Sequence, residues 1–212
     1  MGLRKREAID QIESIHPDAD TVSVEGIEAG LASLESQERR DAVRQVNLLP
    51  EAEKHNFADA LINLISSEQI SAVSEAAFDA LTHALSSDSV AKVFPFLESE
   101  SPLLRNQAIE LLQRVPTLLE PHVETLLGHD NPDVRIFTVD ILGQLPHEHV
   151  PEWVVHVLEN DKHINVLGAA VDRATQLSDP RLLAPLKKVR SAFKDEAYLT
   201  FACDLAIKRL EE

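Results

Sequence analysis

The chain has 212 residues, of which 44% are apolar, so it is long enough and apolar enough to bury a core. Its 36 acidic and 20 basic residues leave a net charge of −16, the wrong sign for a phosphate backbone, so we expect no nucleic-acid partner. A single cysteine and the lack of any apolar run of about eighteen residues argue against secretion and against a membrane span, so the sequence predicts a cytoplasmic protein.

The N-terminal segment is charged and amphipathic. It reads MGLRKREAIDQIESI and has no apolar core of the kind that signal peptides carry. We expect a helix within residues 1–20 that caps the fold. The chain has only six glycines and is rich in Ala, Leu, Glu, Gln and Arg, a composition that favours helix over residues 21–212 as well.

From residue 34 onwards, one pattern returns about every thirty residues. The two clearest copies, SESPLLRNQAIELLQRVP and HDNPDVRIFTVDILGQLP, share Pro, Arg, Leu and Pro at matching positions and cover residues 99–116 and 129–146. Weaker copies cover residues 34–50, 70–85, 164–177 and 196–210. A fixed period of this length is typical of solenoids, in which each unit buries the next.

Each copy is predicted to be the second of two helices. An amphipathic segment with a proline in its first turn precedes it, as in residues 121–129 and 151–160. Short polar turns join the two helices, and Asp130 and Asn131 can cap the second one through their side chains. Arg135, in the first turn of that helix, can reach back to the carboxylate of Asp130 or to one in the adjacent unit.

The second helix of the clearest copy has one core-facing stripe. At a hundred degrees per residue, the residues of this stripe are Val134, Thr138, Ile141, Leu142 and Leu145. One unit alone cannot bury two such stripes, so neighbouring units must stack. The sequence therefore predicts a single all-α domain over residues 1–212, a right-handed α-solenoid of about six two-helix units with an N-terminal cap helix.

Two segments carry a family resemblance. DNPDVRIFTVDILGQL and SDPRLLAPLKKVRSAF, residues 130–145 and 178–193, resemble HEAT repeats, especially the bacterial HEAT-like type shared with phycobilin lyases. The shared features are Asp, then Pro, then Val-Arg at the head of a second helix, and DPRLLAPL at the start of a first helix. The resemblance is clearest over residues 87–212, and it implies that the second helices line the concave side of the solenoid.

The active sites of enzymes in that family have no counterpart in this sequence. HEAT-like deoxyhypusine hydroxylases hold iron on His-Glu pairs just after the arginine, where this chain has Ile136 and Phe137. HEAT-like DNA glycosylases use a basic face, whereas this chain is acidic. Cys203 aligns with apolar Val139, and Trp153 lies in an apolar segment, so both are predicted to pack in the core. We predict no catalytic residue and no cofactor.

Histidines gather at one turn between units. The side chains of His147, Glu148 and His149, and of His156 in the following helix, are of kinds that bind zinc or iron. Polar residues are equally expected in a turn, and the spacing matches no recognised type of metal site. We therefore expect these residues to be solvated and predict no metal site.

Acidic residues recur at one register of the second helices, well away from the buried stripe. They are predicted to form an exposed acidic file along the concave face, made of Asp79, Glu110, Asp140, Asp172 and Asp204. Only the first copy of the repeat has a basic residue at this register, Arg44. Copying of surface residues by descent is the alternative explanation of the file. Phe137 is predicted to be an apolar anchor beside it, or else to pack against the neighbouring unit.

These features predict a non-catalytic scaffold or adaptor. Its acidic concave face would bind a protein partner, and a basic segment of that partner would be attracted electrostatically. One alternative is a HEAT-like lyase-type enzyme or enzyme subunit that holds a small molecule or chromophore in the groove. Another is an architectural subunit that joins a complex through its edges and leaves the groove free.

Overall fold

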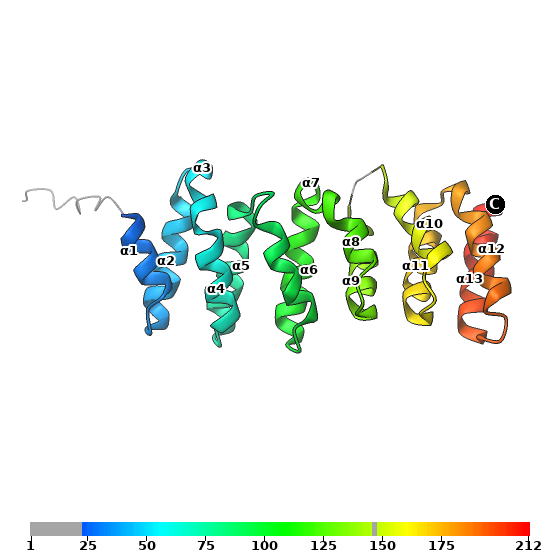
Figure 1. Ribbon diagram of the computed structural model, residues 1–212, viewed down its shortest axis with the longest axis horizontal. Coiled ribbons are helices and arrows are strands. Elements are labelled where there is room, and N and C mark those ends of the chain that lie inside the picture. The colour runs from blue at the N-terminus through cyan, green and yellow to red at the C-terminus, as the bar shows by residue number, and fades with distance from the viewer. Residues whose placement is uncertain (1–22, 146–147) are drawn as a thin grey trace, which may run out of the picture.

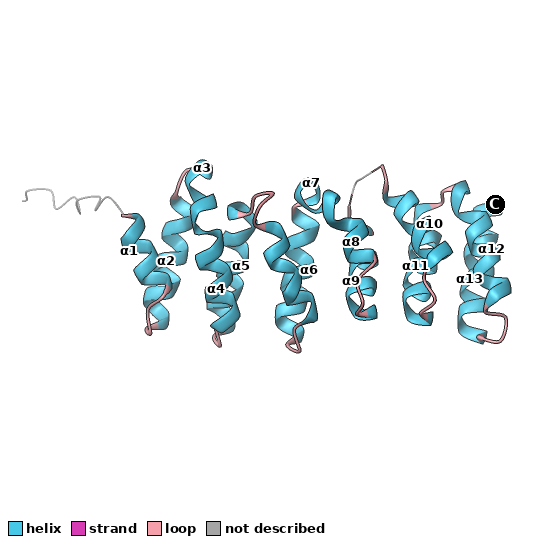
Figure 2. Cartoon of the chain, viewed as in Figure 1, coloured by secondary structure: helices cyan, strands magenta, loops and turns pink. Residues whose placement is uncertain are grey.

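The computed structural model describes residues 23–145 and 148–212, and all regular structure in these residues is helical (Figures 1 and 2). The expected cap helix in residues 1–20 lies outside the described part of the chain. Among the described helices, none combines the length and the apolarity that crossing a bilayer requires.

Every predicted copy of the repeat coincides with one unbroken α-helix. These second helices are α2 (Ser36–Leu48), α5 (Ser71–Ala84), α6 (Pro102–Arg114), α9 (Pro132–Leu142), α11 (Ile164–Leu177) and α13 (Ala197–Glu211). The start of α9 is capped as predicted, because the side chain of Asn131 accepts a hydrogen bond of 2.9 Å from the backbone N–H of Asp133.

The segments that precede the second helices are less regular than predicted. Two are single helices, α1 (Val24–Leu31) and α10 (Val150–Asn160). The others divide into short α and 3-10 pieces: α3 (Glu51–Lys54), η1 (His55–Phe57), α4 (Ala58–Ser67), η2 (Val90–Glu98), α7 (Pro116–Leu119), η3 (Glu120–His122), α8 (Val123–Leu127), η4 (Pro180–Leu182) and α12 (Leu183–Ala192). Pro95 lies inside η2 and Pro121 inside η3, where the missing N–H and the ring of proline oppose a continuous α-helix.

Helical pairs follow one another in an elongated row, with α1 and α13 at opposite ends (Figure 1). Within a pair, the preceding segment packs on its second helix, as α4 does on α5 and α10 on α11. Between pairs, the second helices contact each other in the order α2, α5, α6, α9, α11 and α13. The second helices therefore form one continuous layer, which is the layer that carries the acidic file.

The core runs the length of the row as a single cluster of buried side chains. All five residues of the predicted stripe are buried, four in α9 and Leu145 just after its end, with exposed fractions of 8% or less. Thr138 is the polar member, and its hydroxyl donates a hydrogen bond of 2.7 Å to the carbonyl of Val134, which removes the cost of burying it. Cys203 and Trp153 are also buried, at 0% and 8% exposure, as their apolar surroundings predicted.

Candidate functional site

The acidic file is exposed along its whole length. Its five carboxylates lie at matching registers of α5, α6, α9, α11 and α13, and each belongs to an exposed residue. Arg44, at the same register of α2, is exposed as well. The expectation that this register faces away from the core is therefore confirmed for every copy.

Two acids of the file meet in a hollow between α5 and α6. Asp79 and Glu110 line this hollow of about 460 Å³ together with apolar Phe78 and Leu103. Arg114, also from α6, donates a hydrogen bond from Nη1 to Oδ1 of Asp79 at 3.0 Å. One of the two carboxylates is thus neutralised across the helix-to-helix contact, whereas no cation within the described ranges forms an ion pair with Glu110.

The next two acids meet in a second hollow, between α9, α11 and α13. Asp140 and Asp172 line this hollow of about 430 Å³, with Arg173 and Tyr198 in its wall. Asp140 is exposed, but the walls of the hollow partly desolvate its carboxylate, which raises its pKa; the positive charge of Arg173 lowers the pKa in part, and the negative charge of Asp172 raises it further. Two carboxylates against one guanidinium leave the hollow net negative.

A glycine makes room for the guanidinium in this wall. A Cβ built on Gly143 would lie 1.6 Å from Cζ of Arg173, so a larger residue at position 143 would displace the arginine. Arg173 donates a hydrogen bond of 2.7 Å from Nη1 to Gln176, while its Nε is buried without a partner. The guanidinium therefore lies against the backbone of α9 close to Asp140.

Phe137 does not take the exposed position that a hydrophobic anchor needs. It is half-buried and packs against the hydrophobic core, which agrees better with the alternative of packing within the row than with an exposed anchor. The last acid of the file, Asp204, pairs with Arg190 of α12 and lies outside both hollows. Four of the predicted site residues thus lie two by two in hollows. Of the other two, Asp204 forms an ion pair at the end of the row, and Phe137 packs against the core.

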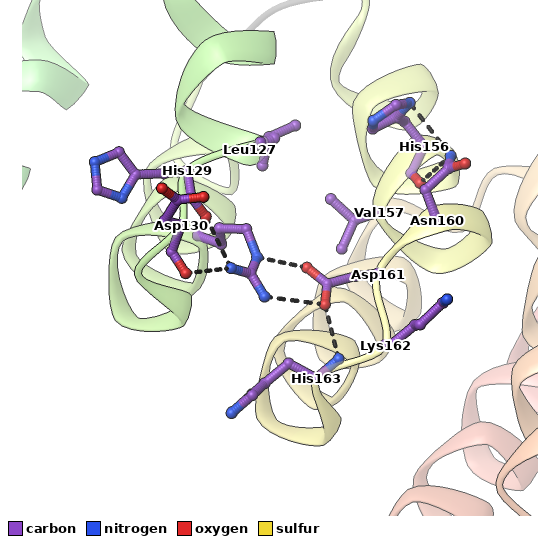
Figure 3. A pocket seen from close by; sticks show the side chains of 11 residues that line it. Leu127, His129, Asp130, His156, Val157, Asn160, Asp161, Lys162 and His163 are labelled. Atoms are coloured by element: carbon purple, nitrogen blue, oxygen red, sulfur yellow. Dashed lines mark hydrogen bonds and ion pairs between the residues drawn. The ribbon is translucent and has the colours of Figure 1, made fainter.

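A third hollow of about 620 Å³ lies at the turns between the helices, and sequence reasoning did not single it out. Arg135 and Asp161 meet in it, and His129, His156 and His163 also line it. In Figure 3, Asp161 points from its own turn toward the turn that carries His129 and Asp130. His156 lies on the opposite side of Asp161 from that turn.

Arg135 joins two consecutive turns. Its Nη1 donates to the backbone carbonyls of His129 and Asp130 at 2.8 and 3.2 Å. Its Nε and Nη2 donate to the two carboxylate oxygens of Asp161 in the next unit, at 2.7 and 3.2 Å. Burial raises the pKa of Asp161, but the hydrogen bonds from Arg135 and from the backbone N–H of His163 outweigh it, so the pKa is lowered. The prediction that Arg135 reaches an acid in the adjacent unit is correct. Asp130 also contacts Arg135, but through its backbone carbonyl rather than its carboxylate.

The same arrangement occurs near the start of the row. Arg39 donates to the carbonyls of Ser33 and Leu34, and also to both carboxylate oxygens of Glu68 in the next unit, at 2.6 and 3.0 Å. Among the described residues, Arg105 makes only the first kind of contact, to the carbonyl of Ser99. The signal available in the sequence was the arginine itself, which recurs at this register, together with an acid three residues before a second helix begins.

The histidine cluster does not form a metal site among the described residues. His149 packs edge-on against the ring of Trp153, with ring centroids 5.9 Å apart, and lies 3.8 Å from Glu120. His156 interacts instead with Asn160 one turn further along α10. No group of three or more His, Cys, Asp or Glu side chains in residues 23–145 and 148–212 is arranged to hold a metal ion; His147 lies outside these ranges.

Comparisons with known proteins add little to this geometry. No family model matches the chain, and no curated protein matches it. A crystal structure of an engineered protein from the Northeast Structural Genomics Consortium is similar over 88% of this chain and 96% of its own length, at 15% identity and a TM-score of 0.42. That likeness is too low to carry an argument about function.

Proposed function

We propose that the chain is a right-handed α-solenoid of about six HEAT-like two-helix units that acts as a non-catalytic scaffold or adaptor. Its acidic file binds a protein partner through a basic segment of that partner. The observation that carries the proposal is the pairing of acids across neighbouring second helices, Asp79 with Glu110 in one hollow and Asp140 with Asp172 in another. Stacked second helices offer such a partner an extended surface.

Three acids of the file are available to the cations of a partner. Arg114 and Arg190 already neutralise two members of the file, whereas no described cation forms an ion pair with Glu110, Asp140 or Asp172. Each exposed ion pair contributes about 0.2–1 kcal/mol. Charge therefore steers the encounter and selects a basic segment, while apolar contacts along the hollows supply much of the affinity.

The test compares two triple variants that change the net charge equally. The first carries Glu110→Lys, Asp140→Lys and Asp172→Lys. The control reverses three exposed acids on the preceding segments, namely Glu28, Glu53 and Glu124. Partners are captured from a lysate of the source cell, identified by mass spectrometry, and their affinities are then measured at increasing salt with the purified partner.

We expect a partner that the wild type and the control bind and that the first variant loses. Its affinity should fall as added salt screens exposed charges over about 8–10 Å. Equal binding by both variants would move the site away from the acidic file and overturn the proposal. A copurifying pigment or other small molecule, with no protein captured, would support the lyase-type alternative instead.

A further inference from the structure

The last helix of the described chain, α13, exposes large apolar side chains on one face. Tyr198, Phe201 and Leu205 are 67%, 62% and 51% exposed, and spacings of three and four residues place them in one stripe. On earlier second helices the same registers are less exposed: buried Val166 stands in place of Tyr198, half-buried Phe137 in place of Phe201 and buried Ile141 in place of Leu205. The stripe is therefore apolar surface of a kind that the rest of the layer buries.

Opposite charges lie at the two ends of this stripe. Beside Tyr198 is the net-negative hollow that contains Asp140 and Asp172. At the C-terminal end of α13, Lys208 and Arg209 are exposed, and no described acid pairs with them. A helix that complements the stripe thus has cations at one end, apolar side chains along its middle and acids after them.

The N-terminal segment of the chain itself has this pattern. Residues 3–15 read LRKREAIDQIESI, and the three cations come first, at residues 4–6. The apolar residues that follow at intervals of three, and so share one face of a helix, are Ile9, Ile12 and Ile15. Two acids then follow, Asp18 and Asp20. The segment matches the stripe of α13 in polarity and in the charges at its two ends; the acids between them, Glu7, Asp10 and Glu13, fall outside the isoleucine spacing.

This segment cannot reach α13 of its own copy. The helices α2 and α13 are separated by five successive contacts between second helices, which is about 40–50 Å at 8–10 Å per contact, and they lie toward opposite ends of the row (Figure 1). If residues 3–15 lie on α13, only residues 16–22 remain as a tether, and seven residues span at most about 25 Å. The occupant of the stripe must therefore come from a second copy of the chain.

We propose that residues 3–15 of one copy dock along the apolar stripe of α13 in a second copy. The cations at residues 4–6 lie toward Asp140 and Asp172, and the acids after Ile15 lie toward Lys208 and Arg209. A contact of this kind uses different surfaces on the two copies, so it joins them head to tail. The inference goes beyond the proposed function because it concerns self-association, and it would stand if no other protein bound the acidic file.

The test is sedimentation velocity of the full chain over a range of concentrations. Two variants each damage one side of the contact, Ile12→Asp in the segment and Phe201→Asp in the stripe, and each is expected to weaken self-association by about tenfold or more. Leu34→Asp is the matched control, because Leu34 is 98% exposed outside the contact, and it should leave association unchanged. Circular dichroism checks that all three variants stay folded.

Mixing the two defective variants separates this arrangement from its alternatives. The Ile12→Asp chain keeps an intact stripe and the Phe201→Asp chain keeps an intact segment, so a 1:1 complex should form from two chains that do not associate alone. If the stripe paired with itself instead, Ile12→Asp would still self-associate, which would overturn the proposal. A wild-type chain that stays monomeric at every concentration would also overturn it and would favour the N-terminal cap.

Discussion

Replacing Arg135 by alanine should destabilise the fold far more than replacing an arginine whose ion pair is exposed to solvent. The guanidinium donates four hydrogen bonds, two to carbonyls of its own turn and two to Asp161 in the next unit. The side chains of Arg135 and Asp161 are only 16% and 9% exposed. This ion pair therefore joins two stacked units in a place where its side chains have little contact with water.

The expected loss for Arg135→Ala is about 3 kcal/mol in the free energy of unfolding. Removing one partner of a buried ion pair costs about 3–5 kcal/mol, because the other charge is left desolvated. Here the loss falls toward the lower end, since Asp161 keeps a 2.8 Å hydrogen bond from the backbone N–H of His163. Arg135→Lys should recover only part of the loss, because an ammonium cannot span two carbonyls and two carboxylate oxygens.

A double-mutant cycle measures the pair itself. It uses Arg135→Ala, Asp161→Asn and the double variant, each unfolded in urea with a check that the slope of the transition is unchanged. The control cycle is Arg181 with Glu152, which also joins neighbouring units at 3.1 Å but is 51% and 60% exposed. We expect a coupling of about 2 kcal/mol for the buried pair and a much smaller coupling for the exposed pair. Equal couplings would refute the argument from burial.

Three further predictions follow from single sites. Hydrogen bonds lower the pKa of Glu68, and in Asp161 they outweigh burial and lower the pKa as well. The stabilisation that these two carboxylates provide is therefore complete above their unfolded-state pKa values of about 4. The urea midpoint should fall as the pH drops below about 4. Burial raises the pKa of the Cys203 thiol to about 11, so a thiol reagent at neutral pH should label it only after urea unfolds the chain. Asn131→Ala removes the cap of α9 and should cost about 1 kcal/mol in the same urea assay, whereas Asn131→Asp should cost little.

The second helices were predictable from sequence because their pattern has one physical cause. The apolar period of residues 132–145 is that of a helix buried on one side, and the structure buries every residue of the predicted stripe. The preceding segments were less predictable. Prolines such as Pro95 and Pro121 are visible in the sequence, but whether they bend a helix or divide it into 3-10 pieces depends on the packing around them.

The contacts between units could be predicted only as alternatives. Arg135 and Asp161 are 26 residues apart, so their contact depends on how far one unit is displaced along the next, which local sequence does not specify. Phe137 lies at the edge of the buried arc of its helix, so its exposure depends on how the neighbouring unit packs. The last copy of the repeat is one of the weaker ones in sequence, yet α13 is an unbroken helix, and it exposes Phe201 at the register of Phe137.

The acids of this chain have two physical roles, and burial separates them. Glu68 and Asp161 lie at the turns, where arginines of the preceding unit hold them in place, so reversing their charge would unfold the contact between units. Glu110 and Asp172 are exposed on the second helices, and no described cation pairs with them, so reversing their charge should leave stability nearly unchanged. A variant that loses partner binding while keeping its urea midpoint therefore identifies the acidic file as the binding face. Loss of both properties together would show only that the stacked units had come apart.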